Sequence, residues 1–330
     1  MKAVASQVFS SPRAAAPSAP PLAETTEPSG IGEQSTIASF WLDSLFRVAE
    51  HAPAVLRLIR GPLSRGVLRC SGATRAGTLA NARRILGSDS THAERRAFAR
   101  RVVENFILFC HDVGRSMRMT PDELYGQIER IEGHEHYDGA RKLKRGAIVV
   151  TAHMGSFEVG MAALRRQDAR IHVVFRRDAF GRFERMRSSL RAKLAVSEAP
   201  VDDGWTVWMR LRDALLNDEV VVLQGDRVMP GQKGHGVDVL GAEMLLPTGP
   251  VKLALATGAP IVPVFCVRTE TGKIRLCVEP PITVEASNPG GIDVAMERLA
   301  RVLGKYVRAH GEQWLMLQPA WREDAETPAL

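Results

Sequence analysis

The chain has 330 residues, of which 45% are apolar, 25% charged and 6% aromatic. This composition excludes a globally disordered protein, and the length is sufficient for one large α/β domain or two smaller ones. The formal net charge is +7, and Arg provides 36 of the 44 basic residues. Guanidinium groups suit phosphate and carboxylate, so anionic partners are expected, although an Arg-rich codon composition explains the excess equally well.

The first 35 residues are rich in Ala, Pro, Ser and Glu and are predicted to form a disordered tail. They lack the continuous apolar stretch of a secretory signal. Segment 37–68 is the best membrane candidate, but six charged residues interrupt it, too many for a spanning helix. Within it, Trp41, Leu42, Leu45 and Phe46 fall at helical spacing. The pattern fits either an amphipathic helix that lies flat on a bilayer or a helix that packs on its own domain.

Residues 36–135 show helical periodicity with few strand-like runs, and 92–117 is predicted to be one long helix. Positions 40–120 contain 14 Arg and no Lys against 6 acidic residues, so the positive excess of the chain lies here. Such a region favours an anionic membrane surface or a phosphate-bearing ligand, and a solvated helix face is the alternative. We therefore expect an Arg-rich helical region that packs on the core or on a membrane surface.

From residue 136 to the end, short apolar runs alternate with helical segments. Predicted strands are 146–152, 171–175, 220–224, 237–241, 261–267 and 273–279. Predicted helices are 157–167, 182–194, 205–216, 250–256 and 291–309. This alternation predicts an α/β domain over 136–330, with a single mostly parallel sheet flanked by helices.

The leading candidate for chemistry is His153, at the point where the apolar run 146–152 stops and a helix begins. Open α/β sheets bind ligands just beyond the carboxyl ends of their strands. Glu158 follows five positions later, and a turn between the two would bring its carboxylate to the imidazole. The pair would then act as a general base and the acid that orients it. The position at a strand end, rather than the spacing, singles out His153, because this spacing also arises by chance.

The residues around His153 resemble a known family. The segment AHMGSFE is similar to the H-x-G-N-W-E block of the bacterial lipid A late acyltransferases, within the lysophospholipid acyltransferases and their H-x4-D/E signature. Similar blocks follow in the same order: VVFRRD (173–178), MRSSLRAKLAV, LLNDEVVVLQGDR (215–227), VDVLGAEMLLPTGPVKLALATGAPIVPVF and GEQWLMLQPAWRED. The chain departs from the family pattern at Ser156, Phe157 and Arg227. The resemblance covers most of the chain.

The resemblance implies a glycerolipid acyltransferase-like fold and transfer of a fatty acyl group to a hydroxyl or amine of a lipid or glycolipid. The implied donor is an acyl thioester, on acyl carrier protein or on coenzyme A, and no cofactor is expected. His153 is implied as the general base and Glu158 as the residue that holds it. Arg176, Arg191, Asp226 and Gly249 match the family and are expected to bind substrate, as is Arg227, which replaces the family's usual Gln.

The resemblance also implies a peripheral or monotopic protein on the cytoplasmic face of the bacterial inner membrane, with an anionic membrane surface as partner and no nucleic acid. Two alternatives remain open: a catalytically idle protein that binds anionic lipid on the same fold, and a thioester or ester hydrolase. No metal site is expected, because His134, His136 and Asp138 have no further partners in the sequence. The four Cys show neither ligand spacing nor a disulfide framework.

Overall fold

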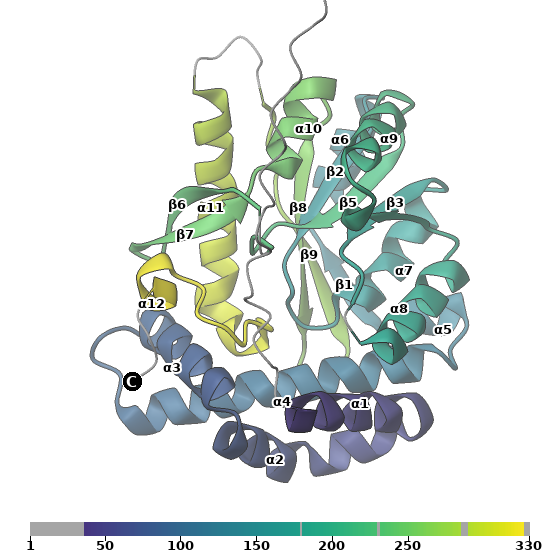
Figure 1. Cartoon of the computed structure of the whole chain (residues 1–330). Helices are drawn as coiled ribbons and strands as arrows, with labels where there is room; N and C mark the ends of the chain where they lie inside the picture. Colours follow the sequence, from purple (N-terminus) through teal and green to yellow (C-terminus); the bar gives the residue numbers. More distant parts are fainter. Residues whose placement is uncertain (1–35, 179, 230–231, 285–289, 327–330) are drawn as a thin grey trace, which may run out of the picture.

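The computed structural model describes residues 36–178, 180–229, 232–284 and 290–326, and of residues 36–41 it describes the backbone. The predicted tail, residues 1–35, lies outside the described residues, as does the side chain of Trp41. In the described part, a central sheet with helices on both sides stands on a layer of N-terminal helices (Figure 1).

The N-terminal helices are α1 (Thr36–His51), α2 (Pro53–Cys70), α3 (Gly72–Leu86), α4 (His92–Ser116) and α5 (Pro121–Tyr125). The predicted long helix is α4, and it begins at a capping box formed by Thr91 and Glu94. Helix α1 approaches α4 closely at Gly114, where a Cβ atom would lie 1.8 Å from the carbonyl oxygen of Ala49. Only glycine permits this contact between the two backbones.

The membrane candidate 37–68 is divided between α1 and α2, which meet at Ala52 and Pro53. Phe46 from α1 and Leu56 from α2 are buried in a cluster with α4 residues such as Ile107. Among the helices that the structure describes, none is both long and apolar enough to cross a bilayer.

The main sheet has seven strands in the order β1-β9-β8-β2-β5-β3-β4. Their bounds are β1 (Ile128–Glu132), β2 (Ala147–Thr151), β3 (Ile171–Phe175), β4 (Ser197–Pro200), β5 (Val220–Gln224), β8 (Ile261–Arg268) and β9 (Ile274–Val278). The five strands from β8 to β4 are parallel, whereas β9 runs antiparallel to β8 and pairs in parallel with β1. The continuous apolar runs of β2 and β5 suit their central places, because both faces of these strands are covered.

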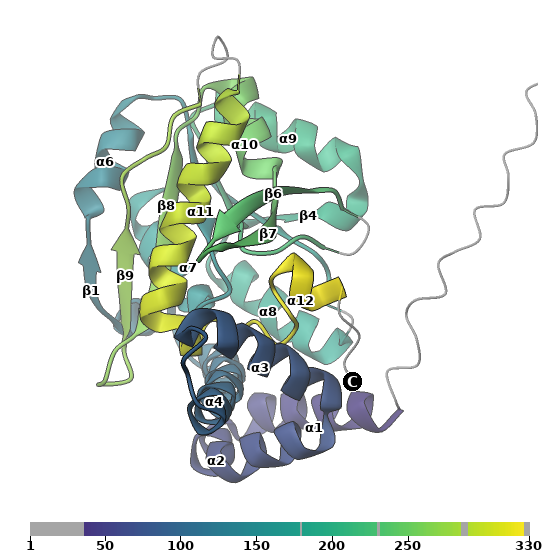
Figure 2. The same cartoon turned by 90° about the vertical axis from the view of Figure 1, so that its left-hand side faces the viewer.

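Alternation along the central strands divides the core into two layers. Val149 and Val222 face a cluster with α5 and with α6 (His134–Lys142), α7 (Phe157–Gln167) and α8 (Gly181–Lys193). Ile148 and Val221 face the other cluster, built with α9 (Trp205–Leu216), α10 (Gly249–Thr257) and α11 (Gly291–His310). The hairpin of β6 (Gly234–Val239) and β7 (Ala242–Pro247) packs beside α11 on this second side, and α12 (Arg322–Glu326) lies near it (Figure 2).

The predicted fold class is confirmed: the sheet is mostly parallel, helices flank it, and a helical region precedes it. Two strands of the main sheet were missed, and so was β7 of the hairpin, because only 237–241 was predicted there. β1 lies inside 36–135, which was expected to be helical, and it pairs with β9 at the sheet edge. β4 has the sequence SEAP, which contains no apolar run. β1 and β4 are edge strands. β1 has no buried residue and β4 has two, so the continuous apolar pattern that reveals central strands is absent from them.

Candidate active site

His153 lies in the turn between β2 and α7, at the carboxyl edge of the sheet. Gly155 in this turn has φ +57°, and a Cβ atom there would lie 2.4 Å from the carbonyl oxygen of Cys266, so the turn requires glycine. The segment after α11 fixes the turn through two backbone hydrogen bonds. Leu315 donates to the His153 carbonyl oxygen (2.7 Å), and Gly155 donates to that of Gln313 (3.0 Å).

The side-chain partner of His153 is Asp226, two residues after the end of β5. The distance from His153 Nδ1 to Asp226 Oδ1 is 2.7 Å. The carboxylate of Asp226 is fully buried, and its second oxygen accepts a hydrogen bond from the indole nitrogen of Trp314 (2.8 Å). The imidazole is 27% exposed. One ring nitrogen is therefore bound to a fixed carboxylate, which leaves Nε2 for an incoming group.

The electrostatics of this pair favour a neutral imidazole beside an ionised carboxylate. Burial of the ring, and then the positive charge of Arg227, lower the pKa of His153 below its usual value, against the opposing effect of Asp226. Burial alone would raise the pKa of Asp226, but His153, Arg227 and the hydrogen bonds to the carboxylate hold that pKa well below its usual range. At neutral pH, His153 is thus unprotonated and able to accept a proton.

The expected contact between Glu158 and His153 is not what the structure contains. Glu158 is the second residue of α7, is 3% exposed, and its Oε1 accepts a hydrogen bond from Nε of Arg187 in α8 (2.6 Å). The carboxylate that contacts the imidazole comes instead from the loop after the neighbouring strand β5, because the carboxyl ends of adjacent parallel strands meet at one edge. Asp226 was expected to bind substrate, and the structure places it on the imidazole.

The other predicted binding residues are scattered. Arg227 lies beside the pair: its Nη2 is 3.4 Å from Asp226 Oδ2, and its buried Nε has no partner among the described residues. Arg176 is exposed after β3 and pairs with Asp202 (3.5 Å). Gly249 begins α10, where a Cβ atom would lie 2.8 Å from the Trp208 ring, so its visible role is packing.

Arg191 is fully buried, which corrects the expectation that it contacts substrate. Its guanidinium pairs with Glu184 and Glu198 and stacks 3.9 Å above the Phe175 ring. These contacts hold α8 against β3 and β4. They leave the side chain out of reach of a ligand.

Two residues of the site were not predicted, Trp314 and Arg187. Trp314 stands in the GEQWLM block, which resembles the family, so a signal for it was present. Arg187 stands in a helix with many Arg, and nothing in the sequence distinguishes it from its neighbours.

An apolar cavity of about 90 Å³ lies between α7, α6 and the sheet. Phe157 lines one part of it, and the ring of Phe157 meets His153 edge-on with centroids 5.5 Å apart. The remaining wall is aliphatic for the most part, including Val149, Val264 and Leu276. The cavity therefore begins one aromatic ring away from the candidate base.

In the described ranges, no group of three or more His, Cys, Asp or Glu is arranged to hold a metal ion. His134, His136 and Asp138 lie on α6, on the far side of the cavity from His153. The four Cys are free; Cys70 is exposed and the other three are buried.

Comparison of the sequence with known proteins identifies the family of this chain. Over 225 residues the chain is 28% identical to a phosphatidylinositol mannoside acyltransferase of Mycobacterium tuberculosis. The matched region covers 67% of this chain and 69% of that protein. Over 240 residues it is 26% identical to the protein of the same name from Mycolicibacterium smegmatis, covering 72% and 73% of the two chains. Residues 34–323 match the family described as bacterial lipid A biosynthesis acyltransferase. The chain therefore belongs to this family of acyltransferases.

Proposed function

We propose that the chain transfers a fatty acyl group from an acyl thioester, on acyl carrier protein or coenzyme A, to a sugar hydroxyl or amine of a glycolipid. The observation that carries the proposal is the 2.7 Å contact between His153 and the buried Asp226 at the carboxyl edge of the sheet. The relatives are named for phosphatidylinositol mannoside and the family for lipid A, and both compounds are glycolipids. Because a glycolipid acceptor lies in a membrane, we also propose that the protein acts on the cytoplasmic face of the inner membrane, as a peripheral or monotopic protein.

In the proposed reaction, Nε2 of His153 removes the proton from the acceptor hydroxyl or amine as that group attacks the thioester carbonyl. Asp226 holds the Nδ1–H tautomer and stabilises the imidazolium that forms. The tetrahedral intermediate then collapses, its carbon–sulfur bond breaks, and the thiolate takes the proton from the imidazolium. The products are the acylated lipid and the free thiol of the carrier. Arg227, beside the pair, is suited to hold the negative charge that develops on the carbonyl oxygen.

Replacement of the proposed base tests the reaction directly. We expect His153→Ala to lower turnover by about 10²–10⁴-fold or more, since it removes the only proton acceptor of the mechanism. The measurement is the mass of the products formed by the purified protein from acyl-thioester donors and a panel of lysolipids and glycolipids. Acylated lipid supports the proposal, whereas free fatty acid alone identifies a hydrolase.

His172→Ala is the matched control. His172 is on β3, near the amino edge of the sheet, and pairs with Glu219 (2.6 Å). We expect it to retain turnover. Acyl transfer at the parent rate in His153→Ala, or no turnover by the parent chain with any acceptor that it binds, would overturn the proposed mechanism.

We further propose that the cavity behind Phe157 receives the acyl chain of the donor. Its apolar lining suits a hydrocarbon chain, and its wall includes Val264 on β8, near the middle of the sheet. We expect Val264→Phe to shift the preference toward shorter donors by about tenfold or more, and Val264→Ala to shift it toward longer ones. A mixture of acyl thioesters of different length, analysed by the mass of the acylated lipid, measures both shifts. If both variants keep the donor preference of the parent, the acyl chain binds outside this cavity.

A further inference from the structure

The solvent side of α2 carries an apolar stripe that no described part of the chain covers. Val55, Leu58 and Ile59 are 41%, 81% and 39% exposed, and exposed Pro62 continues the pattern. These positions follow the i, i+3, i+4, i+7 spacing of one helix face. We call these four residues the α2 stripe. The opposite face of the helix is already buried against the molecule, so helix packing does not require the stripe.

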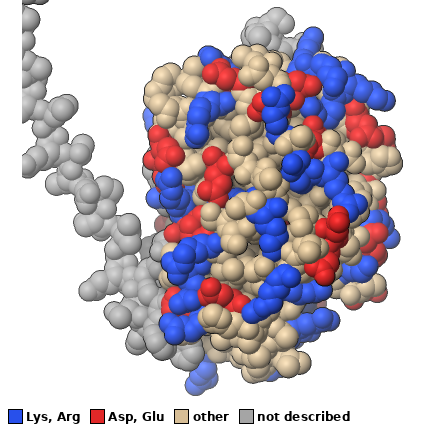
Figure 3. Space-filling model, turned by 90° about the vertical axis from the view of Figure 1, so that its right-hand side faces the viewer, with Lys and Arg blue, Asp and Glu red and all other residues tan. Residues whose placement is uncertain are grey.

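The charged residues of α2 and α3 have one sign. Residues 51–88 contain seven Arg and no Asp or Glu. Arg65 and Arg69 lie on the exposed side of α2, and neither pairs with an acid in the described ranges. On the face of the molecule in Figure 3, basic and acidic side chains alternate over most of the surface, whereas the lowest part, at the level of α1 and α2, is tan and blue. An apolar stripe flanked by unpaired Arg is complementary to anionic lipid headgroups above acyl chains.

The stripe lies at the end of the molecule that carries the site. The helix that α2 packs on, α4, also contacts the site: Phe109 of α4 stacks on Phe157 with ring centroids 4.8 Å apart. In Figure 1, α1, α2 and α4 form the layer beneath the sheet, on the side to which β2 leads. A bilayer that contacts α2 is therefore on the side of the protein where a lipid acceptor has to enter.

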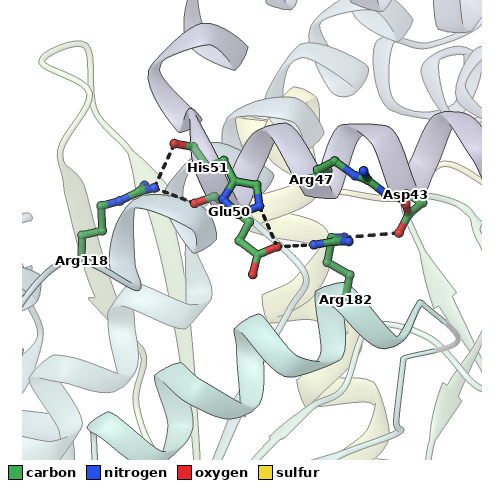
Figure 4. Close-up of polar contacts among 6 residues, drawn as sticks. All are labelled: Asp43, Arg47, Glu50, His51, Arg118 and Arg182. Atoms are coloured by element: carbon green, nitrogen blue, oxygen red, sulfur yellow. Dashed lines mark hydrogen bonds and ion pairs between the residues drawn. The ribbon is translucent and has the colours of Figure 1, made fainter.

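Polar contacts fix the corner between α1 and α2 to the rest of the chain (Figure 4). Nη2 of Arg118 donates to the carbonyl oxygens of Glu50 (2.8 Å) and His51 (2.9 Å), at the end of α1. Arg182 from α8 pairs with the Glu50 carboxylate and with Asp43 (3.4 Å). Because this corner is tied to the segment directly after α4 and to α8, contact of α2 with a surface also sets the orientation of the site.

We propose that the α2 stripe, with Arg65 and Arg69, docks the protein on a bilayer that contains anionic lipid. The inference depends on the proposed function in one respect: the acceptor lipid is taken from this same bilayer. The apolar side chains enter the interface, and the two guanidinium groups contact phosphate. Docking then brings the acceptor headgroup to the same end of the molecule as His153.

Vesicle co-sedimentation of the full chain tests the proposal. We expect the parent to bind vesicles of phosphatidylglycerol and phosphatidylcholine, to bind phosphatidylcholine alone weakly, and to lose affinity as salt rises. Leu58→Glu should weaken binding by about tenfold or more, because a large exposed apolar side chain no longer enters the bilayer. Its control is Leu143→Glu, an exposed Leu beside basic residues after α6, which should bind like the parent.

The charge is tested by Arg65→Gln together with Arg69→Gln, against Arg298→Gln with Arg301→Gln on α11. Both doubles remove two exposed Arg, so a non-specific effect of net charge would weaken both equally. We expect only the α2 double to lose affinity, by about tenfold or more. Cys70, the exposed Cys at the end of α2, accepts an environment-sensitive fluorophore, whose emission should shift when vesicles are added.

His153→Ala separates this proposal from the proposed function, because it should bind vesicles like the parent and yet fail to transfer. Unchanged vesicle binding by Leu58→Glu would overturn docking through α2. If Leu58→Glu binds vesicles like the parent but has a different sedimentation coefficient, a second copy of the chain covers the stripe. If neither vesicle binding nor the sedimentation coefficient differs from the parent, residues 1–35 cover the stripe or nothing does. Each of these outcomes excludes the bilayer as the occupant.

Discussion

Asp226→Asn is expected to lower kcat by about 10²–10⁴-fold while the protein remains folded. The carboxylate accepts a hydrogen bond from Nδ1–H of His153 and so leaves the lone pair of Nε2 free to take a proton. An amide of the same shape donates its NH₂ to Nδ1, which favours the tautomer with the proton on Nε2. The measurement is single-turnover transfer, with circular dichroism to verify folding.

The pH profile of the remaining activity distinguishes a positioning role from general damage. The charge of Asp226 raises the pKa of His153 against burial and Arg227, so its removal lowers this pKa further. Transfer requires the unprotonated imidazole, and the acid side of the rate profile should therefore move to lower pH in Asp226→Asn. Asp218→Asn, at the opposite end of β5, is the control and should keep both rate and profile. An Asp226→Asn protein with the parent kcat would remove Asp226 from the mechanism.

Glu158→Gln is expected to lower the free energy of unfolding by about 3 kcal/mol, because it leaves the charge of Arg187 buried without its partner. Glu158 is 3% exposed and the Arg187 side chain 14%, so water replaces little of the lost interaction. Urea denaturation monitored by fluorescence gives the change. If Glu158 acted only in catalysis, Glu158→Gln would have the same urea midpoint of unfolding as the parent.

A double variant isolates the ion pair. When both partners are neutral, as in Glu158→Gln with Arg187→Gln, no buried charge is left alone, and most of the lost stability should return. The comparison is Glu326→Gln, which breaks the exposed pair with Arg322 and should cost less than about 0.5 kcal/mol. If the double variant is no more stable than Glu158→Gln, the effect arises from packing of α7 and not from charge.

The buried strands could be predicted from local pattern because each carries its own signal. VVVLQ and IHVVF are short apolar runs next to polar turns, and they form β5 and β3 at the predicted residues. The helices 157–167 and 205–216 also begin and end where their patterns do. Edge strands such as SEAP gave no such signal, since SEAP contains no apolar run and only two of its four residues are buried.

The predicted position of His153 at the carboxyl edge follows from the same logic, because a residue directly after a parallel strand stands at that edge. Its partner could not be predicted in this way. The choice between Glu158, five residues away, and Asp226, seventy-three residues away, depends on which strand lies beside β2. Sheet order is a property of the folded chain, and the distance along the sequence carries no information about it.

The sequence by itself determined three things. They are the helices and buried strands that local hydrophobic periodicity controls, the place of His153 after β2, and the resemblance of ordered sequence blocks to the acyltransferase family. What only the tertiary structure decided is which charges meet: Asp226 with His153, Glu158 with Arg187, and the buried Arg191 with Glu184 and Glu198. The physical reason is that apolar burial acts on every element through its own pattern, whereas an ion pair forms only between groups that packing has already brought within a few ångströms.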